Sequence, residues 1–557
     1  MLRRIAVCCA ATALLAICLS VARAQDMGAI NGQVFDQSRA PVPNVTVAAV
    51  NQDTGLTRQA VSNPEGAFLI QALPPGRYTI NAQISGFKAF SQTGIQVSVG
   101  QNARADVRLE VGTVTENVTV AANALAVDTQ GSTVGGTIDN ERLAALPLLD
   151  RNVLSLAVML PGVGQATLPT VVTNSRSGPT ISVAGGRLRD NNFMLDGATL
   201  VSTMYMTPQN LPQPDALEEF RVLTNTYAAE YGSGVGSIFL AVTKSGNNTF
   251  HGNVFEYFRN DRLNARNAFS TSVPFLRQNQ FGASLGGPVT LPFYKGRDRT
   301  FFFFSYQGLR LSQQGLSTSF PATLAERAGD FSATAKPVID PTTGVPFGGN
   351  RIPTSRMDTL SVNVYRLYQP LLPTQANGQN TLLQSTRLKN DQISTKVDHS
   401  FSQANKLSVR YFRNGDGSRE KTPVELLPVI RAGADVPVQS ILISDTHSFS
   451  PVTLVEFRAS YTRVPSVLLD SRVKQKSAKE LGGNFNQPTA VSPQVSISSR
   501  AGVSPGTISR EIDNQWQVEA KLSRVTGRHA LKFGGAAWYA RQLTATKWRA
   551  NGIFTFD

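Results

Sequence analysis

The sequence predicts a mainly β protein with an N-terminal β-sandwich and, later in the chain, part of an antiparallel transmembrane β-barrel. Three observations support this prediction: an export signal at the N-terminus, short β-rich runs between turn residues up to residue 111, and amphipathic strands separated by long polar loops after residue 247. At 557 residues the chain is too long for one ordinary hydrophobic core, so we expect it to divide into several domains.

Residues 1–24 are typical of a secretory signal peptide. Arg3 and Arg4 precede an apolar run over residues 5–19, and Ala22-Arg23-Ala24 ahead of Gln25 provides a cleavage site. The apolar run is shorter than the roughly 20 residues that cross a bilayer as a helix. No later stretch approaches that length, so we predict that the mature chain has no transmembrane helix.

Cysteine content and charge narrow the classes of function. Cys8, Cys9 and Cys18 all lie in the signal peptide, so we expect an exported protein without disulfides, held together by strand pairing and burial. The formal net charge of the whole chain is +15, but its Lys and Arg residues are spread singly among polar residues. This pattern argues against nucleic-acid binding and favours contact with anionic headgroups of outer-membrane lipid.

Residues 27–111 carry the signature of a compact β-sandwich. Proline and glycine turns at 41–43, 63–66 and 74–76 separate strand-sized runs, because proline fixes φ and glycine accepts positive φ. The expected strand-sized runs are 32–34, 45–47, 66–70, 77–80, 95–99 and 105–109.

The turns of this region point to a known domain family. The segments 63–68 (Asn-Pro-Glu-Gly-Ala-Phe), 73–78 (Leu-Pro-Pro-Gly-Arg-Tyr) and 86–87 (Gly-Phe) resemble the carboxypeptidase regulatory-like domain. That resemblance implies a carbohydrate-binding-like fold without catalytic activity. It leaves two roles open: a periplasmic domain that binds a glycan or a partner, and a spacer.

We expect no enzyme activity, no metal and no cofactor. The four histidines, at positions 251, 399, 447 and 529, are isolated and lack zinc-ligand spacing. Neither a nucleophile with its base nor paired carboxylates emerge from the mature sequence.

Residues 112–124 are predicted to be a linker that contains a coupling segment. Apolar and polar residues alternate over 114–121, and the segment resembles a TonB box, which adds as a strand to the periplasmic domain of TonB. TonB and its inner-membrane motor complex are the partners this implies. The alternative is that the segment is another strand of the sandwich. The candidate box residues are Thr115, Glu116, Val118, Thr119 and Val120.

Residues 125–246 resemble the plug domain of TonB-dependent receptors of the Oar-like group. The matching motifs are Gly-Gly-Arg at 185–187, Asn-Asn-Phe-Met-Leu-Asp-Gly at 191–197 and Ala-Leu-Glu-Glu-Phe-Arg-Val at 216–222. Before them, apolar spacing over 139–156, interrupted by Pro147, suggests two short helices or turns. Polar candidates that either face ligand or hold the plug inside the barrel wall are Arg187, Arg189, Asp190, Asn191 and Asp196.

Residues 247–557 are predicted to be the N-terminal part of the barrel. Alternation over 454–461 and 515–522 gives one face suited to lipid and one suited to a wet lumen. A half-buried strand of a soluble sandwich has the same period, so the signal peptide and the plug motifs decide for a membrane. We also expect His251 and His529 to be rim residues, and the four phenylalanines at 301–304 to form a lipid-facing girdle.

The motifs at 242–252, 280–288 and 528–534 also resemble the barrel of an Oar-like receptor. The resemblance implies a Gram-negative outer-membrane receptor for energy-coupled uptake of a siderophore, oligosaccharide, peptide or vitamin, with a periplasmic N-terminal domain. The alternative function is a non-transporting adhesin or carbohydrate-binding surface protein. Such receptors close with about 22 strands, which exceeds what residues 247–557 can hold, so we expect an incomplete barrel.

Overall fold

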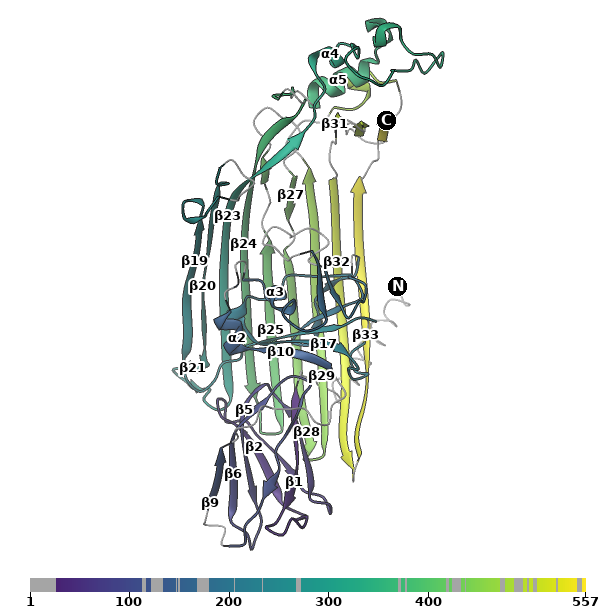
Figure 1. Ribbon diagram of the computed structural model, residues 1–557. Helices are drawn as coiled ribbons and strands as arrows, with labels where there is room; N and C mark the ends of the chain where they lie inside the picture. Colours follow the sequence, from purple (N-terminus) through teal and green to yellow (C-terminus); the bar gives the residue numbers. More distant parts are fainter. Residues whose placement is uncertain are drawn as a thin grey trace, which may run out of the picture.

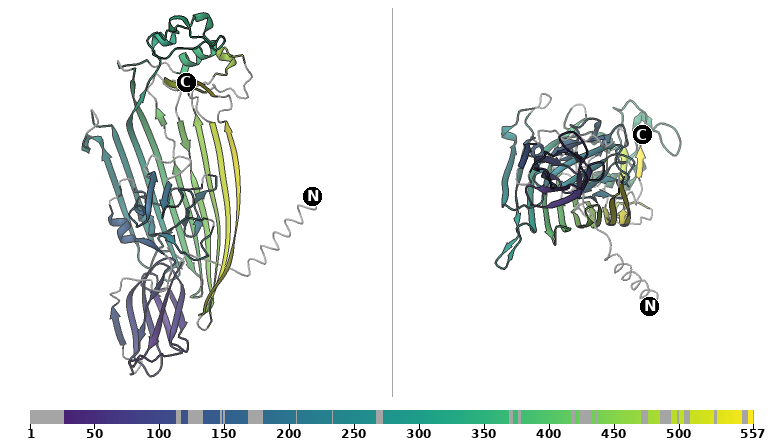
Figure 2. Two further views of the ribbon diagram at one scale, coloured as in Figure 1. Left: turned by 45° about the vertical axis from the view of Figure 1, so that its right-hand side comes forward. Right: turned by 90° about the horizontal axis from the view of Figure 1, so that it is seen from below.

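The computed structural model places a small sandwich, a plug sheet and a long curved barrel sheet along one axis (Figure 1). The plug lies within the curve of the barrel sheet, and the sandwich lies at one end of it (Figures 1 and 2). The structure describes residues 27–112, 117–121, 134–146, 148, 151–167, 180–204, 206–232, 234–266, 272–368, 372–375, 378–416, 420–422, 432–435, 437–470, 476–484, 494–497, 500–503, 508–526, 529–547 and 553–556.

The sandwich consists of two sheets with strand orders β3-β2-β5-β6-β9 and β4-β1-β7, with β8 also paired to β1. Alternate residues point inward, as in β5, where Tyr78, Ile80 and Ala82 are buried and their neighbours are not. The strands are β1 (Gly28–Phe35), β2 (Thr46–Asn51), β3 (Thr57–Val61), β4 (Ala67–Leu73), β5 (Gly76–Gln83), β6 (Ala89–Val97), β7 (Asn102–Arg104), β8 (Val107–Arg108) and β9 (Asn117–Ala121).

Turn chemistry sets the sandwich corners. The Asn63 side chain accepts hydrogen bonds from the backbone N–H groups of Glu65 and Ala67, which closes the turn before β4. Gly66 follows with φ +73°, and a Cβ there would overlap the carbonyl of Val34. This turn therefore requires glycine, as the sequence predicted.

Strand β9 changes the expected boundary of the sandwich. Residues 117–121 pair in parallel with β6, from Ala89 opposite Asn117 to Thr93 opposite Ala121. The region predicted as a linker over 112–124 thus contains the last strand of the five-stranded sheet, because its alternating pattern suits the free edge of β6.

The plug is built on a mixed five-stranded sheet of order β10-β17-β18-β13-β14. Two small hairpins, β11 with β12 and β15 with β16, accompany the sheet. The strands are β10 (Val134–Asp139), β11 (Val163–Thr167), β12 (Thr180–Val183), β13 (Asn192–Leu195), β14 (Ala198–Thr199), β15 (Val201–Ser202), β16 (Thr207–Pro208), β17 (Leu217–Asn225) and β18 (Ile238–Thr243).

Two short helices, α2 (Asn140–Ala145) and α3 (Leu154–Ala157), confirm the prediction made from apolar spacing, and a 3-10 turn, η1 (Pro214–Ala216), precedes β17. Asp139 caps α2 by accepting a hydrogen bond from the Arg142 N–H. The apolar core of the plug continues into the barrel wall through Phe412 and two valines. Plug and barrel are therefore packed against each other.

The barrel sheet has the antiparallel path β19-β20-β23-β24-β25-β28-β29-β32-β33, with β26 on β24 and β27 on β29. Among the described strands, β19 and β33 form its two edges. The strands are β19 (His251–Asn260), β20 (Leu276–Pro288), β23 (Thr300–Ser319), β24 (Asn380–Ser400), β25 (Asn405–Asp416), β26 (Glu420–Thr422), β27 (Ala432–Asp435), β28 (Val438–Ser450), β29 (Thr453–Asp470), β32 (Ile508–Thr526) and β33 (His529–Lys547).

The two faces of the barrel sheet reverse the usual rule of polar outside and apolar inside. On β32, Gln515 and Gln517 face the plug and are 9% and 5% exposed, whereas Trp516 and Val518 point outward and are 39% and 47% exposed. The predicted alternation over 454–461 and 515–522 is therefore present. Buried polar residues with an exposed apolar face are typical of a barrel that surrounds a polar interior.

Aromatic residues form a ladder across three neighbouring strands on the outer face. Tyr461, Trp516 and Tyr539 stand directly opposite one another in the register of β29, β32 and β33. The Trp516 ring centroid lies 5.3 Å from that of Tyr461 and 5.4 Å from that of Tyr539. We call these three residues the aromatic ladder.

The phenylalanine run at 301–304 is only half of the predicted girdle. Phe301 and Phe303 are buried, whereas Phe304 is 40% exposed. Successive residues of a strand point to opposite faces, so a run of four cannot all face lipid. His251 and His529 are the first residues of β19 and β33, which confirms their rim position.

Beyond the end of the barrel sheet opposite the sandwich lie the short helices α4 (Leu324–Arg327) and α5 (Thr359–Tyr368), together with the strand β31 (Figure 1). None of the helices in the described ranges has the length and apolarity that crossing a bilayer demands. The remaining elements are β21 (Thr290–Leu291), β22 (Tyr294–Lys295), β30 (Gln494–Ile497), β31 (Arg500–Val503), β34 (Ile553–Phe556), η2 (Asp261–Leu263), η3 (Gly348–Asn350), η4 (Thr354–Arg356) and η5 (Lys479–Leu481).

Candidate functional site

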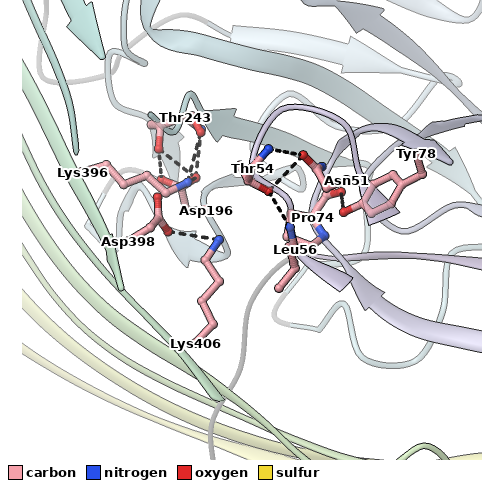
Figure 3. Close-up of polar contacts among 10 residues, drawn as sticks. All are labelled: Asn51, Thr54, Leu56, Pro74, Tyr78, Asp196, Thr243, Lys396, Asp398 and Lys406. Atoms are coloured by element: carbon pink, nitrogen blue, oxygen red, sulfur yellow. Dashed lines mark hydrogen bonds and ion pairs between the residues drawn. The ribbon is translucent and has the colours of Figure 1, made fainter. Parts of the chain in front are cut away.

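Asp196 is the centre of a buried charge cluster between plug and barrel (Figure 3). It follows β13 at φ +49°, and its carboxylate accepts hydrogen bonds from the Thr243 backbone N–H at 2.9 Å and from the Thr243 hydroxyl. From the barrel, Arg410 Nε lies 3.1 Å and Lys396 Nζ 3.7 Å from its oxygens. The three charged side chains are 7%, 1% and 4% exposed, so this interaction is almost fully desolvated.

A second ion pair lies beside this cluster on the same inner wall. Lys406 Nζ of β25 is 3.3 Å from Asp398 of β24, and these side chains are 11% and 2% exposed. Together, Lys396, Arg410, Lys406 and Asp398 of the wall and Asp196 of the plug make a group of three cations and two carboxylates. Replacing one member of such a buried ion pair by a neutral residue lowers the stability by about 3–5 kcal/mol, because the remaining charge stays buried without a partner.

Gly197 allows the plug to approach the wall closely. It has φ +81°, and a Cβ at this position would overlap the guanidinium of Arg458. Arg458 in turn lies 3.6 Å from Glu519 of the neighbouring strand. The Asp-Gly turn after β13 therefore contacts three barrel strands, β24, β25 and β29.

Glu230 of the plug forms another charged contact with the wall. Its two carboxylate oxygens accept hydrogen bonds from Lys521 at 2.7 Å and Lys532 at 2.8 Å, and Lys521 also lies 3.1 Å from Glu456. Burial alone would raise the pKa of Glu230, but the two lysines hold this pKa at about 2. Glu230 is therefore ionised at any physiological pH.

Further hydrogen bonds join the plug to the barrel wall. The Thr203 N–H and hydroxyl donate to Asp513 at 2.7 and 2.9 Å, and Gln515 donates to the Val201 carbonyl at 2.7 Å. Gln392 donates to the Leu211 carbonyl at 3.1 Å. Water can replace each of these bonds, so the net contribution to stability is about 0.5–1.5 kcal/mol for each amide-to-carbonyl bond and about 1.5–3 kcal/mol for each bond to the Asp513 carboxylate.

The sandwich is attached to the plug through Val99. The Val99 N–H donates to Glu219 at 2.8 Å, and the Val99 carbonyl accepts a hydrogen bond from Arg221. The Val99 side chain is fully buried and belongs to the same apolar cluster as Leu240 and Val242 of β18. Burial raises the pKa of Glu219 to about 7, against the opposing effects of the Val99 N–H and Arg221.

The sandwich also contacts the end of the barrel wall. Arg58 of β3 donates to the Gln403 carbonyl at 2.8 Å and to the Ser448 hydroxyl at 2.7 Å. Arg58 is 7% exposed, and burial lowers its pKa. The sandwich is thus fixed to both other parts of the molecule.

A cavity of about 310 Å³ remains where the three parts meet. The sandwich contributes Asn51, Thr54 and Pro74, and the barrel contributes Lys396 and Lys406. Figure 3 shows the sandwich groups across from the charged groups of plug and wall. The Asn51 side chain accepts from the Thr54 N–H at 2.9 Å and the Thr54 hydroxyl at 3.0 Å, which shapes the sandwich side of this cavity.

The structure separates the five polar plug candidates. Asp196 and Asn191 are buried; Asn191 accepts from the Ser237 N–H at 3.0 Å and donates to the Ile181 carbonyl, so it holds the plug together. Arg187 and Arg189 are exposed, and Asp190 is half-buried. Asp196 takes the wall-binding role, and no common cluster of the five is present.

The candidate coupling residues are split between described and undescribed segments. Thr115 and Glu116 lie outside the described residues, whereas Val118, Thr119 and Val120 belong to β9. The backbone of these three residues is paired with β6, which is the alternative that the sequence left open.

Arg151 was not singled out by the sequence. Its guanidinium pairs with Asp215 and lies 4.4 and 4.3 Å from the ring centroids of Phe255 and Tyr257 on the edge strand β19. Burial lowers its pKa. Contacts of this kind join residues far apart in the chain, so no local pattern could have revealed them.

In the described part of the chain, no three His, Asp or Glu side chains lie together as a metal site would require.

Two family models match the chain. The carboxypeptidase regulatory-like domain matches residues 29–110, and the outer membrane beta barrel domain matches residues 242–557, more than half of the chain.

Individual proteins are also similar to the chain. The TonB-dependent transporter Oar of Myxococcus xanthus is 26% identical over 303 residues, which are 52% of this chain and 27% of that protein. The outer membrane transporter YddB of Escherichia coli aligns with TM-score 0.44 and 10% identity, over 74% of this chain and 48% of its own. The siderophore receptor PirA of Acinetobacter baumannii aligns with TM-score 0.42 and 15% identity, over 73% and 48%. The chain spans about a quarter of the curated relative and about half of each solved chain.

Proposed function

The chain belongs to the outer membrane beta barrel domain family, and from this premise we propose that it acts in a TonB-dependent receptor that imports its ligand in an energy-coupled manner. The observation that carries the proposal is a plug sheet held against the barrel wall by buried ion pairs of Asp196 and Glu230. A plug held in this way can close a pore and can also be moved. The similarity to a TonB-dependent transporter supports the proposed import function.

In the proposed mechanism, ligand binds on the side of the plug opposite the sandwich, and the plug shifts. TonB then pulls on the segment Thr115–Val120 from the periplasm, and the charged contacts around Asp196 open. Water and ions can solvate the separated charges, so the interface can open and close without exposing a large apolar surface. No covalent bond is made or broken in this mechanism.

The ligand is proposed to be a small molecule, such as a siderophore, or an oligosaccharide. Arg187, Arg189 and Asp190 remain the plug candidates for contact with it, because they are the more exposed members of the predicted set. Asp196 and Asn191 are assigned to holding the plug. The sandwich is proposed to lie in the periplasm.

Uptake of labelled ferric siderophores and oligosaccharides by cells that carry the complete receptor tests this function. Deleting Thr115–Val120 should abolish uptake and spare surface binding, because coupling is lost while the ligand face is intact. A matched deletion of residues 122–127 removes the same length of chain beside the segment and should keep some coupled uptake.

Two outcomes would contradict the proposal. Unchanged uptake after deletion of Thr115–Val120 would show that the coupling segment lies elsewhere. Binding of a labelled oligosaccharide without import in energised cells would instead favour the alternative, a carbohydrate-binding or adhesive surface protein.

A further inference from the structure

Strand β9 is held by the sandwich through one edge only. It pairs with β6 over five residues, from Ala89 opposite Asn117 to Thr93 opposite Ala121. Among the described strands, none pairs with its other edge. Because a single neighbour holds it, β9 can leave the sheet by giving up one row of backbone hydrogen bonds.

The pairing of β9 is also the weakest kind in its sheet. The pairs β3 with β2, β2 with β5 and β5 with β6 are all antiparallel, whereas β9 and β6 are parallel. Parallel pairing is slightly less stable per residue, and five residues provide few bonds. Detaching β9 would leave the three antiparallel pairings among the other four strands in place.

The position of β9 in the chain decides which part of the molecule bears a pulling force applied to β9. Residues 122–133 connect β9 to β10, the edge strand of the plug sheet, which pairs with β17. While β9 stays on β6, a pull on it loads the sandwich, which is fixed to plug and wall through Val99 and Arg58. Once β9 has left β6, the same pull reaches β10 and the plug.

We propose that β9 is a stowed coupling segment: the sandwich holds its backbone on β6, and the periplasmic domain of TonB must displace it from β6 in order to bind. This inference rests on the proposed function and on its placement of the coupling segment at Thr115–Val120. It gives the sandwich a regulatory role, because the sandwich then competes with TonB for the same strand. Strand exchange conserves main-chain hydrogen bonds, since β9 leaves one edge strand and joins another.

A disulfide between β6 and β9 tests the proposal directly. The only cysteines of the chain are at positions 8, 9 and 18, within the predicted signal peptide, so an introduced pair has no competitor in the exported protein. Ser91→Cys with Thr119→Cys joins residues that stand opposite each other in the register. The control pair, Thr46→Cys with Gln83→Cys, joins β2 to β5 of the same sheet and leaves β9 untouched.

The measurement is binding of the purified periplasmic domain of TonB to the complete receptor in detergent, oxidised and then reduced. The oxidised 91–119 pair should bind at least about tenfold more weakly, since it cannot supply the strand whose main chain gives the affinity, and reduction should restore binding. The control pair should bind equally in both states. Equal binding by the oxidised and reduced 91–119 pair would overturn the stowage of β9.

Two further measurements separate failure of this inference from failure of the proposed function. Deletion of Thr115–Val120 should abolish TonB binding; if binding persists, the placement of the coupling segment is wrong. Hydrogen exchange on the unmodified receptor should show faster exchange in Ala89–Thr93 of β6 when TonB is added, because β6 loses its partner. Unchanged exchange there, with TonB bound, would mean that β9 is recognised in place and would overturn the proposal.

Discussion

The sandwich core and the plug and barrel interface are held together by opposite chemistry. The sandwich encloses a continuous apolar cluster in which Ile30, Val47, Tyr78 and Ile80 are fully buried. The plug meets the wall mainly through carboxylates, lysines, arginines and amides, with Phe412 among the few apolar residues shared by both. Both regions are buried, but only the plug and barrel interface can be separated into water at a small cost in free energy.

This difference indicates which part of the molecule stays in place and which part can move. Exposing an apolar core costs about 25 cal/mol for each Å² that water regains, and nothing in water replaces the lost contacts. An exposed ion pair or amide is instead solvated at once, so a polar interface opens without a comparable loss. The sandwich is thus a stable anchor, and the plug is a detachable part.

The largest effect is expected when the polar interface is left half-paired. Asp196→Ala leaves Arg410 and Lys396 buried without their carboxylate, and we expect the plug to lose about 3–5 kcal/mol of stability. Hydrogen exchange of plug peptides in the complete receptor measures this loss. Asp190→Ala, in the half-buried turn just before β13, is the control and should change exchange little; equal effects would contradict the role of the Asp196 cluster.

A comparable but local effect is expected in the apolar core. Ile80→Ala removes a fully buried side chain from the middle of the sandwich and should cost about 2–5 kcal/mol. Exchange should rise in sandwich peptides and not in plug peptides. Val61→Ala, at a position that is 45% exposed, is the matched control and should shift stability by no more than about 0.5 kcal/mol. If plug peptides respond equally to Ile80→Ala, the two regions are one folding unit.

The joint between the two regions should depend on pH through Glu219. Its pKa is about 7 when Val99 is docked, against an ordinary value of 4.5, so the docked state binds more protons between these values. Docking should therefore weaken as the pH rises from about 4.5 to about 7 and stay at its weakest above that. The labelling rate of a Val99→Cys thiol, corrected for thiolate formation, measures opening, and Glu219→Gln should make it independent of pH. A pH slope that remains in Glu219→Gln after the correction for thiolate formation would assign the effect to another group.

The smallest effect is expected at the rim of the polar interface. Lys532→Ala removes a 2.8 Å contact with Glu230, but the Lys532 side chain is 54% exposed, so the loss should stay below about 1 kcal/mol. Lys521→Ala at the same carboxylate removes a side chain that is 14% exposed and also contacts Glu456, and should cost several times more. Equal losses in plug hydrogen exchange would mean that burial does not decide the strength of these pairs.

Much of the fold could be predicted from local pattern. Turn residues around Gly66 and the alternation in β29 and β32 act within a few residues, so they can be read along the chain. The plug sheet could not be derived in this way, because β13 pairs in parallel with β18, far along the chain, and neither strand alternates: both are buried throughout. Only the resemblance of motifs suggested it.

For the candidate site, the sequence predicted one central residue of the plug but not its partners on the barrel wall. Asp196 was selected from a motif, but its partners Lys396 and Arg410 lie on barrel strands about 200 residues away, where single charged residues carry no signal. The same holds for Glu219 and Val99. For β9 the pattern was compatible with both a coupling segment and a sandwich strand, and pairing with β6 does not exclude either role.

The aromatic ladder has a consequence for how deep the protein sits in its bilayer. Tyrosine and tryptophan on the outside of a barrel mark the level of the lipid headgroups, and the apolar band between two such levels is about 25 Å tall. Tyr461 lies eight positions after Thr453, at the sandwich end of β29, which is a rise of about 26 Å along the strand and about 20 Å along the membrane normal at the usual tilt of about 35–45°. Past the ladder, β29 continues to Asp470 with Arg463 on its course. With the ladder at the outer headgroup level, the apolar band would surround the sandwich-side half of the wall, and the other half would extend beyond the bilayer on the side away from the sandwich.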